Sequence, residues 1–403
     1  MLKKAIRVAD LQFGMYIAEL DRPWTETPFM FQGFHLRTQR QLEALRKHCR
    51  QVYVDVARGE KLTGAGATSE PSPDATLPGF QLRGTASYAG ETAVEKELHV
   101  AAELYSRTTI ALRDSFAPFA NGAAVLDGKE LDECVKRLGN SVVRNPDALL
   151  LMSKMRDTNV PAHARALQVS IYMMVFARFL QLERDQMHLL GLLGLLQDVG
   201  KLRLPAEVLE NERSPTAEDE AILRKHVELS AHVLSVTPGL PPKLPSLALL
   251  HHEKQDGTGY PRGFKGYQIG LNGSIAAICD RYDMLLAPPP YGEGLSTQAA
   301  VNMLLGERGS AFHGPLVEQF IRCVGSFPVG TAVELSSGEL GVVIAENSTQ
   351  RLKPKVMLVQ DDAHRRIRSR KIIDLAARSG EHYRIRRALN QTALKFDPTE
   401  LFL

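Results

Sequence analysis

Apolar residues recur every three or four positions through the middle of the chain, across residues 91–327. Leu98, Ala101 and Tyr105 are the first to show this spacing. It places apolar side chains on one face of a helix, and such a face has to pack against another element. Several helices of this kind in succession predict a bundle. We therefore expect a mainly α fold with residues 91–327 as its core.

One helix in this region has a clear start signal. Thr216 is followed three residues later by Asp219, which matches the capping box in which a hydroxyl and an acid satisfy the first free amides of a helix. Acidic residues are also favoured in the first helical turn. The pattern predicts a helix that begins at Thr216 and runs past His226.

The regions on either side of the helical one have other patterns. Residues 1–57 contain a strand pattern at 4–8, a helical stretch at 38–49 and alternating valines at 51–56, which predicts a small α+β domain. Residues 58–90 are rich in Gly, Ser, Thr, Pro and Ala and are interpreted as a flexible linker. Short apolar runs within residues 328–375 predict a small β element, and residues 376–403 a basic tail.

Composition is that of a folded globular chain, with 44 % hydrophobic and 24 % charged residues, which excludes collagen-like and wholly disordered proteins. Its 403 residues suit two or three domains. The net charge is +3, but residues 351–387 hold 12 Lys+Arg against 4 Asp+Glu. Because repeated aromatic residues for base stacking are missing there, we interpret this run as a solvated face and expect no nucleic-acid partner.

The chain shows no membrane-spanning pattern. Its longest uncharged stretches, residues 169–177 and 189–196, are about half of the roughly 20 apolar residues that a spanning helix needs. Lys3 and Lys4 are followed by polar residues and not by the apolar run of a signal peptide. The four cysteines form no Cys-x-x-Cys pair, which favours reduced thiols. We therefore expect a cytoplasmic protein.

Acidic and histidine side chains gather in the second half of the helical region. Asp198 follows an apolar helical run. The further members, in chain order, are His226, His251, His252, Asp280 and Asp283. Imidazole and carboxylate groups bind zinc, iron and manganese, and a carboxylate can bridge two ions. Because adjacent histidines lie about 100° apart around a helix, His251 and His252 reach one cluster only at a helix end or across two ions.

Four segments of this region resemble the HD-GYP subgroup of the HD phosphohydrolase superfamily. They are Gln197-Asp198-Val199-Gly200-Lys201, the helix around His226, His251-His252-Glu253-Lys254-Gln255-Asp256-Gly257-Thr258-Gly259-Tyr260-Pro261, and Ile278-Cys279-Asp280-Arg281-Tyr282-Asp283. The resemblance covers residues 150–325. It implies a helical domain in which two or three metal ions serve the hydrolysis of the bacterial second messenger cyclic di-GMP. Residues 5–57 resemble the small uncharacterised domain that often precedes it in proteobacterial members.

The resemblance assigns one metal site to Asp198, His226, His251 and His252, with Asp198 as a bridging carboxylate. All four residue types are present. The family's second site uses a histidine on an upstream helix, the histidine of the His-Asp pair, the same bridging aspartate and Asp280. The implied cofactor is a divalent metal, iron or manganese, with one or two ions bound.

Two ligands of the second site are replaced in this chain. Gln197 stands where the histidine of the His-Asp pair belongs, and an amide oxygen is a weaker ligand than imidazole. Arg165 stands at the position of the upstream histidine, where its charge opposes a cation. His163 is two positions away, which turns its side chain by about 200° around a helix, so it substitutes only if the helix is locally shifted.

The resemblance gives Lys201 a role in binding phosphate, so Asp198 and Lys201 are the expected catalytic residues. It also implies a loop that approaches the substrate and signalling partner proteins, formed by Asp256, Gly257, Gly259, Tyr260 and Pro261. A simpler interpretation of that loop is a tight turn, because glycine tolerates positive φ and proline fixes its own φ. In the same way, Asp198 and Lys201 could form only an ion pair at a helix end.

Three functions stay open at this level. The first is a cyclic di-GMP signalling protein of the phosphodiesterase family whose hydrolysis is weak or absent because one metal site is lost. The second is a fully active phosphodiesterase with His163 as the substitute ligand. The third is a non-catalytic nucleotide receptor or protein-interaction module. The sequence gives no indication of the oligomeric state.

Overall fold

The structure is a computed structural model of the chain. It describes residues 3–22, 34–36, 39–55, 81–88, 92–154, 162–210, 212, 215–287, 294–347, 350, 352–363, 365–367, 371–380 and 382–389. The chain divides into two compact units, Met1–Ala75 and Thr76–Leu403. The predicted linker residues 58–80 and the tail residues 390–403 lie outside the described residues.

The first unit is a small antiparallel sheet with one helix. Its elements are β1 (Lys3–Arg7), η1 (Val8–Asp10), β2 (Tyr16–Leu20), β3 (Phe34–His35), α1 (Gln39–His48) and β4 (Gln51–Asp55). The strand order is β1-β4-β2-β3. Val52 and Val54 of β4 are buried with Leu45 of α1, as the alternating valines predict. The expected strand, helix and strand pattern of this region is therefore confirmed.

The second unit is built mainly of helices. They are α2 (Val94–Ala120), α3 (Gly128–Arg144), α4 (Pro146–Lys154), α5 (Ala162–Phe179), α6 (Arg184–Leu196), η4 (Val199–Arg203), α7 (Ala206–Glu210), α8 (Ala217–Val236), α9 (Leu244–Ala248), η5 (Gly266–Gln268), α10 (Gly270–Leu286), α11 (Thr297–Gly306) and α12 (Gly314–Val324). The mainly α fold predicted from the sequence is confirmed. Among the described residues, no helix is long and apolar enough to cross a membrane.

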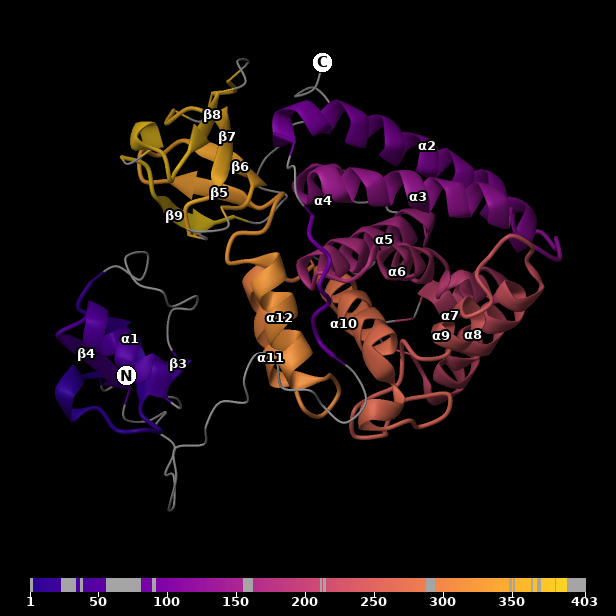
Figure 1. The fold of residues 1–403 in the computed structure, drawn as a ribbon, viewed down its shortest axis with the longest axis horizontal. Helices are drawn as coiled ribbons and strands as arrows, with labels where there is room; N and C mark the ends of the chain where they lie inside the picture. Colours follow the sequence, from indigo (N-terminus) through magenta and orange to yellow (C-terminus); the bar gives the residue numbers. More distant parts are fainter. Residues whose placement is uncertain are drawn as a thin grey trace. The chain divides into compact units, whose positions relative to one another are not determined.

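Helices α5 and α6 lie at the centre of this bundle, with α2 and α3 on one side and α10 on the other (Figure 1). Both are apolar on nearly all faces, which is the pattern of a helix buried in a core. Gly194 lets them approach closely, because a Cβ there would lie 2.7 Å from the Cα of Ser170. The central pair thereby carries Arg165 and Asp198 on a rigid support.

Helix α8 begins where the sequence predicts. The Thr216 hydroxyl accepts a hydrogen bond from the amide of Asp219, and the Asp219 carboxylate accepts one from the amide of Thr216. This capping box satisfies amides that have no partner within the helix. Because α8 continues to Val236, His226 lies in its interior, where the side chain is buried.

The last described part of the chain is a five-stranded antiparallel sheet. Its strands are β5 (Ala332–Leu335), β6 (Leu340–Ala345), β7 (Lys355–Gln360), β8 (Ile372–Asp374) and β9 (Ile385–Ala388), in the order β8-β7-β6-β5-β9. The sheet continues past residue 375, where the predicted β element ended, so part of the predicted basic tail is a strand. The reason is that β9 pairs antiparallel with β5 and that Ile385 packs against the core of the sheet. Arg386 and Arg387 also pair with Glu334 of β5, at 2.9 Å and 2.6 Å.

The end of the predicted linker is also ordered. The amides of Gly84 and Ala86 donate to the carbonyls of Leu180 and Gln181, at 2.9 Å and 3.0 Å. Leu82 is buried beside them. Residues 81–88 therefore run along the turn after α5, and the prediction of a flexible linker up to residue 90 is wrong for this segment, because its backbone and Leu82 find partners on the helical unit.

Candidate metal centre

Asp198 lies at the junction between α6 and η4, directly after the last turn of α6. A close approach of η4 to α8 brings it to the histidines. Gly200 makes that approach possible, because a Cβ there would lie 2.3 Å from the carbonyl oxygen of His226. The Gly200 amide donates to the hydroxyl of Ser230 at 2.8 Å. As a result, Asp198 Oδ1 lies 3.1 Å from His226 Nε2.

The rings of His226 and His251 are oriented by backbone carbonyls. His226 Nδ1 lies 2.5 Å from the carbonyl oxygen of Leu223, and His251 Nδ1 lies 2.7 Å from that of Ala248. A carbonyl only accepts hydrogen bonds, so each Nδ1 carries the proton and donates. In the neutral ring this leaves the Nε2 lone pair available as a ligand, which is the usual outer-shell arrangement of metal-binding histidines.

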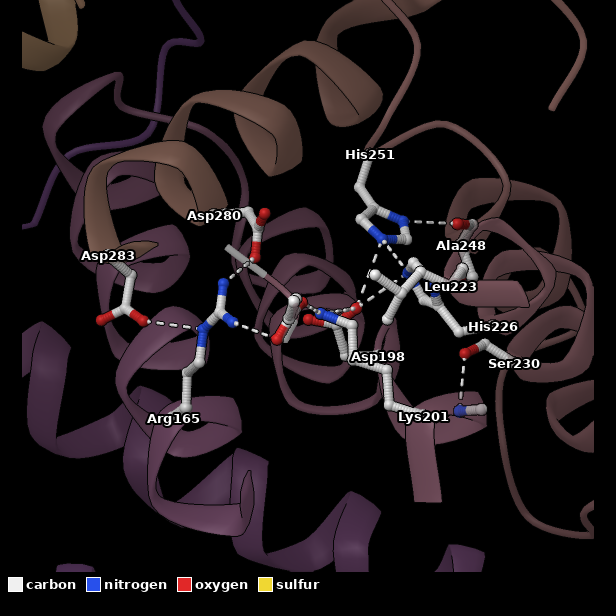
Figure 2. A network of polar contacts seen from close by, with 12 residues as sticks. Arg165, Asp198, Lys201, Leu223, His226, Ser230, Ala248, His251, Asp280 and Asp283 are labelled. Carbon is white, nitrogen blue, oxygen red and sulfur yellow. Dashed lines mark hydrogen bonds and ion pairs between the residues drawn. The ribbon is translucent and has the colours of Figure 1, made fainter. Parts of the chain in front are cut away.

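The two Nε2 atoms face each other. They lie 3.3 Å apart, and His251 Nε2 is also 3.5 Å from Asp198 Oδ1 (Figure 2). Together with His252, one ligand atom from each of these four residues lies within 4.8 Å of the others. Two nitrogen lone pairs and a carboxylate that converge on one point repel each other unless a cation or proton lies between them. The donor set therefore fits a divalent cation with imidazole and carboxylate ligands.

His252 links this cluster to the predicted loop. Its ring lies 4.1 Å from that of His251, and it stacks on the ring of Tyr260 at 4.8 Å with an interplanar angle of 25°. Burial lowers the pKa of His252 well below its usual value, and the neighbouring His251 and His226 add to the effect. The ring is thereby kept neutral, which is the form that binds metal.

Tyr260 and the residues after it are held by Glu253. Glu253 is 1 % exposed, and its two carboxylate oxygens accept hydrogen bonds from the amides of Arg262 and Phe264, both at 2.8 Å. The Tyr260 amide donates to the carbonyl of His252 at 3.1 Å. The role of Glu253 was not predicted from the sequence, although its place directly after the two histidines was a signal.

The other predicted loop residues form the turn itself. The exposed Asp256 accepts hydrogen bonds at its Oδ1 from the amide and the hydroxyl of Thr258, at 2.8 Å and 2.7 Å. Gly257 has a φ of 82°, which glycine adopts without strain. Tyr260, by contrast, turns its ring to His252. The structure therefore brings Tyr260 to the cluster, and it places Asp256 and Gly257 in a tight turn.

Arg165 projects from α5 into a set of acidic side chains. Its Nη2 lies 3.2 Å from Asp280 Oδ1 and its Nε 3.1 Å from Asp283 Oδ2. Figure 2 shows these two contacts on one side of Asp198, whereas His226 and His251 lie on the other side in this view. Asp280 and Asp283 are only 4 % and 6 % exposed, so Arg165 supplies the positive charge that two buried carboxylates need.

Lys201 has two acidic partners. Its Nζ lies 3.2 Å from Asp198 Oδ1 and 2.6 Å from Glu212 Oε1. The other oxygen of Glu212 lies 3.8 Å from Arg165 Nη1. Burial would raise the pKa of Glu212, but the charges of Lys201 and Arg165 outweigh it, so the pKa is lowered and the group stays ionised. Sequence reasoning missed Glu212, which lies in a turn after α7.

Two further predicted positions can be located. Gln197 is 1 % exposed, and neither its Oε1 nor its Nε2 has a hydrogen-bond partner among the described residues. A buried polar group without a partner costs about 1–3 kcal/mol. His163 is the second residue of α5, and its side chain lies outside the described part of the structure.

Comparisons with known proteins cover almost the whole chain. Residues 3–126 match a domain of unknown function (DUF3391), residues 150–316 match the HD domain, and residues 332–396 match the KOW domain associated with HD domain. A solved structure, the HDG"Y"P protein Bd1817 from Bdellovibrio bacteriovorus, aligns with 79 % of this chain and 98 % of its own, at 16 % identity and a TM-score of 0.42.

Two curated relatives carry names of enzymes. A cyclic di-GMP phosphodiesterase of Pseudomonas aeruginosa is 31 % identical over 387 residues, which cover 96 % of this chain and 91 % of the relative. The cyclic di-GMP phosphodiesterase response regulator RpfG of Xanthomonas campestris pv. campestris is 31 % identical over 36 % of this chain and 39 % of its own length. Because the first similarity extends over nearly the full length of both proteins, the chain belongs to the HD-GYP family of HD-domain proteins.

Proposed function

We propose that this chain is a bacterial cyclic di-GMP signalling protein that holds one divalent metal ion and hydrolyses cyclic di-GMP weakly or not at all. The nucleotide is the one named in both phosphodiesterase relatives. The helical domain at 91–327 carries the site, and the proposed location is the cytoplasm.

The proposed metal ligands are Asp198, His226, His251 and His252. This assignment is supported by the convergence of four donor atoms within 4.8 Å and by the orientation of two imidazole rings by backbone carbonyls. Iron or manganese suits a set of three imidazoles and a carboxylate. A divalent cation supplies Lewis acidity, which polarises a phosphoryl oxygen and lowers the pKa of water.

One observation carries the proposal that catalysis is weak, namely the contacts of Arg165. The family pattern gives Asp280 to a second metal ion, whereas here Asp280 pairs with Arg165 at 3.2 Å. A guanidinium keeps its charge at every accessible pH. Two unit charges about 4 Å apart repel by about 4 kcal/mol at an effective dielectric of about 20, and a divalent ion by about twice as much. Arg165 therefore opposes the binding of a second cation at this carboxylate.

The loss of a second ion affects the chemical step directly. Two-metal sites stabilise both the attacking and the leaving oxygen of a phosphodiester displacement. Changes in the outer shell of a metal site alone cost about 10- to 100-fold in affinity or activity, and a missing ligand costs at least as much. Gln197 adds to this loss, because it replaces the second ligand with an amide.

The remaining residues of the site support binding. Lys201 offers a positive charge to a phosphoryl group beside Asp198, from which its Nζ is 3.2 Å away. Tyr260 covers His252 with its ring, and Arg224 lies 4.7 Å above the Tyr260 ring. We propose that the loop of Asp256, Gly257, Gly259, Tyr260 and Pro261 contacts the nucleotide or a signalling partner protein.

The test combines metal analysis with turnover. The purified full chain is loaded with manganese or iron and analysed for metal per chain, and cyclic di-GMP hydrolysis is followed by chromatography. We expect one ion per chain, binding of cyclic di-GMP and little or no linear dinucleotide or GMP. Asp198→Ala should lose the ion, whereas the exposed loop variant Asp256→Ala should keep it. Two tightly bound ions together with efficient hydrolysis would overturn the proposal.

A further inference from the structure

Glu212 connects the two cationic side chains of the site. Its Oε1 lies 2.6 Å from Lys201 Nζ, and its Oε2 lies 3.8 Å from Arg165 Nη1. The three residues come from different elements, because Arg165 belongs to α5 and Lys201 to η4, whereas Glu212 follows α7. A single carboxylate therefore uses both of its oxygens on a pair of cations.

Lys201 and Arg165 are the side-chain types that bind phosphate, Lys as a point charge and Arg as a planar fork. Like a carboxylate, a phosphodiester shares one negative charge between two oxygens. We infer that Glu212 occupies the anion site of Lys201 and Arg165 and competes there with a phosphoryl group of the ligand. The inference rests on the proposed function for the identity of that ligand, and it adds a residue that limits binding.

Acidic side chains outnumber cationic ones around Lys201 and Arg165, which disfavours a second anion beside Glu212. The described side chains of this network are Arg165, Lys201, Asp198, Glu212, Asp280 and Asp283. Two of them are cationic and four are acidic, and Lys154 adds a further cation near Asp283. The acidic groups therefore outnumber the cations while Glu212 is in place. A phosphodiester that enters without displacing Glu212 places a second negative charge beside its carboxylate, in a site of low dielectric. Exchange of one anion for the other leaves the net charge unchanged.

An entering anion can displace the side chain of Glu212. Its side chain is 30 % exposed, whereas Asp280 and Asp283 on the other side of Arg165 are buried. Arg165 keeps these two buried partners when Glu212 leaves, and Lys201 keeps Asp198. Glu212 can therefore be displaced without leaving either cation unpaired, which distinguishes it from the buried carboxylates.

The test measures ligand affinity in the manganese-loaded full chain. Isothermal titration with cyclic di-GMP, and separately with inorganic phosphate, compares the unmodified chain with Glu212→Gln. Glu210→Gln is the matched control, because it makes the same change of charge at an exposed residue two positions away. We expect both ligands to bind Glu212→Gln at least about tenfold more tightly than the unmodified chain, which is a gain of about 1.4 kcal/mol in binding free energy. Glu210→Gln should bind both ligands with the affinity of the unmodified chain.

Thermal unfolding without ligand shows whether each variant is folded, and Glu212→Asp provides a second variant. The aspartate side chain is one methylene shorter than that of glutamate, so its carboxylate does not reach both cations. We therefore expect tighter binding of both ligands to this variant as well. Unchanged or weaker binding of both ligands to the folded variants would overturn the inference. If phosphate binding tightens while cyclic di-GMP binds to no variant, the anion site stands and the proposed nucleotide is wrong.

Discussion

Replacement of Arg165 by methionine tests whether this side chain stands in for a metal ion. The change keeps the aliphatic stem and removes the charge. It leaves Asp280 and Asp283, which are 4 % and 6 % exposed, without the partner that lies 3.2 Å and 3.1 Å away. Removal of one partner of a buried ion pair costs about 3–5 kcal/mol, so we expect a loss of stability in this range for the helical unit.

The same change should create a binding site for a second cation. Once the first site is loaded with manganese, further Mn²⁺ finds two carboxylates that Arg165→Met leaves unpaired. An ion that binds only the folded state adds about 2.7 kcal/mol when its free concentration is about 100 times its Kd. Excess Mn²⁺ should therefore restore most of the lost stability in the variant, and it should have little effect on the unmodified chain.

The assay is urea unfolding followed by far-UV circular dichroism, at two manganese concentrations. Arg281→Met is the matched control, because Arg281 also forms two ion-pair contacts, at 2.5 Å and 3.1 Å, with a partner, Glu307, that is 29 % exposed. We expect Arg281→Met to lose less stability than Arg165→Met, and manganese should not restore that loss. If Arg165→Met unfolds like the unmodified chain, or if excess manganese restores both variants equally, the reasoning is refuted.

Three further substitutions test the approach of η4 to α8, the ion pair of Glu97 and the role of Tyr260. Gly200→Ala places a Cβ 2.3 Å from the His226 carbonyl, so it should separate η4 from α8 and lower manganese affinity by at least about tenfold in equilibrium dialysis. Glu97→Gln removes the charge that pairs with Arg144 at 2.7 Å and should cost about 2 kcal/mol in urea unfolding; the exposed Glu103→Gln should leave the midpoint unchanged. Tyr260→Ala removes the ring stacked on His252 and should weaken binding of cyclic di-GMP while one manganese ion per chain is retained; loss of the ion would contradict this role of Tyr260.

Periodicity and capping signals were sufficient to predict most of the fold. The helical spacing around Leu98 and the capping box at Thr216 correspond to α2 and α8. Two features were not predictable from local pattern. Strand β9 depends on antiparallel pairing with the distant strand β5, in which Arg387 lies opposite Glu334. The order of residues 81–88 depends on hydrogen bonds to the turn after α5, so neither feature has a signal in neighbouring residues.

The candidate site, too, was predicted in part from the sequence. The ordered motif was sufficient to predict that Asp198, His226, His251 and His252 come together, and the structure places their donor atoms within 4.8 Å. Their role as metal ligands stays a prediction. The partners of Arg165 were not predicted, because which carboxylates it meets depends on how α5 packs against α10. Glu212 was missed because a glutamate in a turn carries no periodic or motif signal.

We propose that this chain holds one ion because a guanidinium takes the place of the second. Electron paramagnetic resonance of the protein with saturating manganese tests it most directly, since two Mn²⁺ ions that share a carboxylate are magnetically coupled. We expect the hyperfine spectrum of an isolated ion, and we expect magnetic coupling to appear when Arg165→His and Gln197→His are combined. An exchange-coupled pair in the unmodified chain would contradict it.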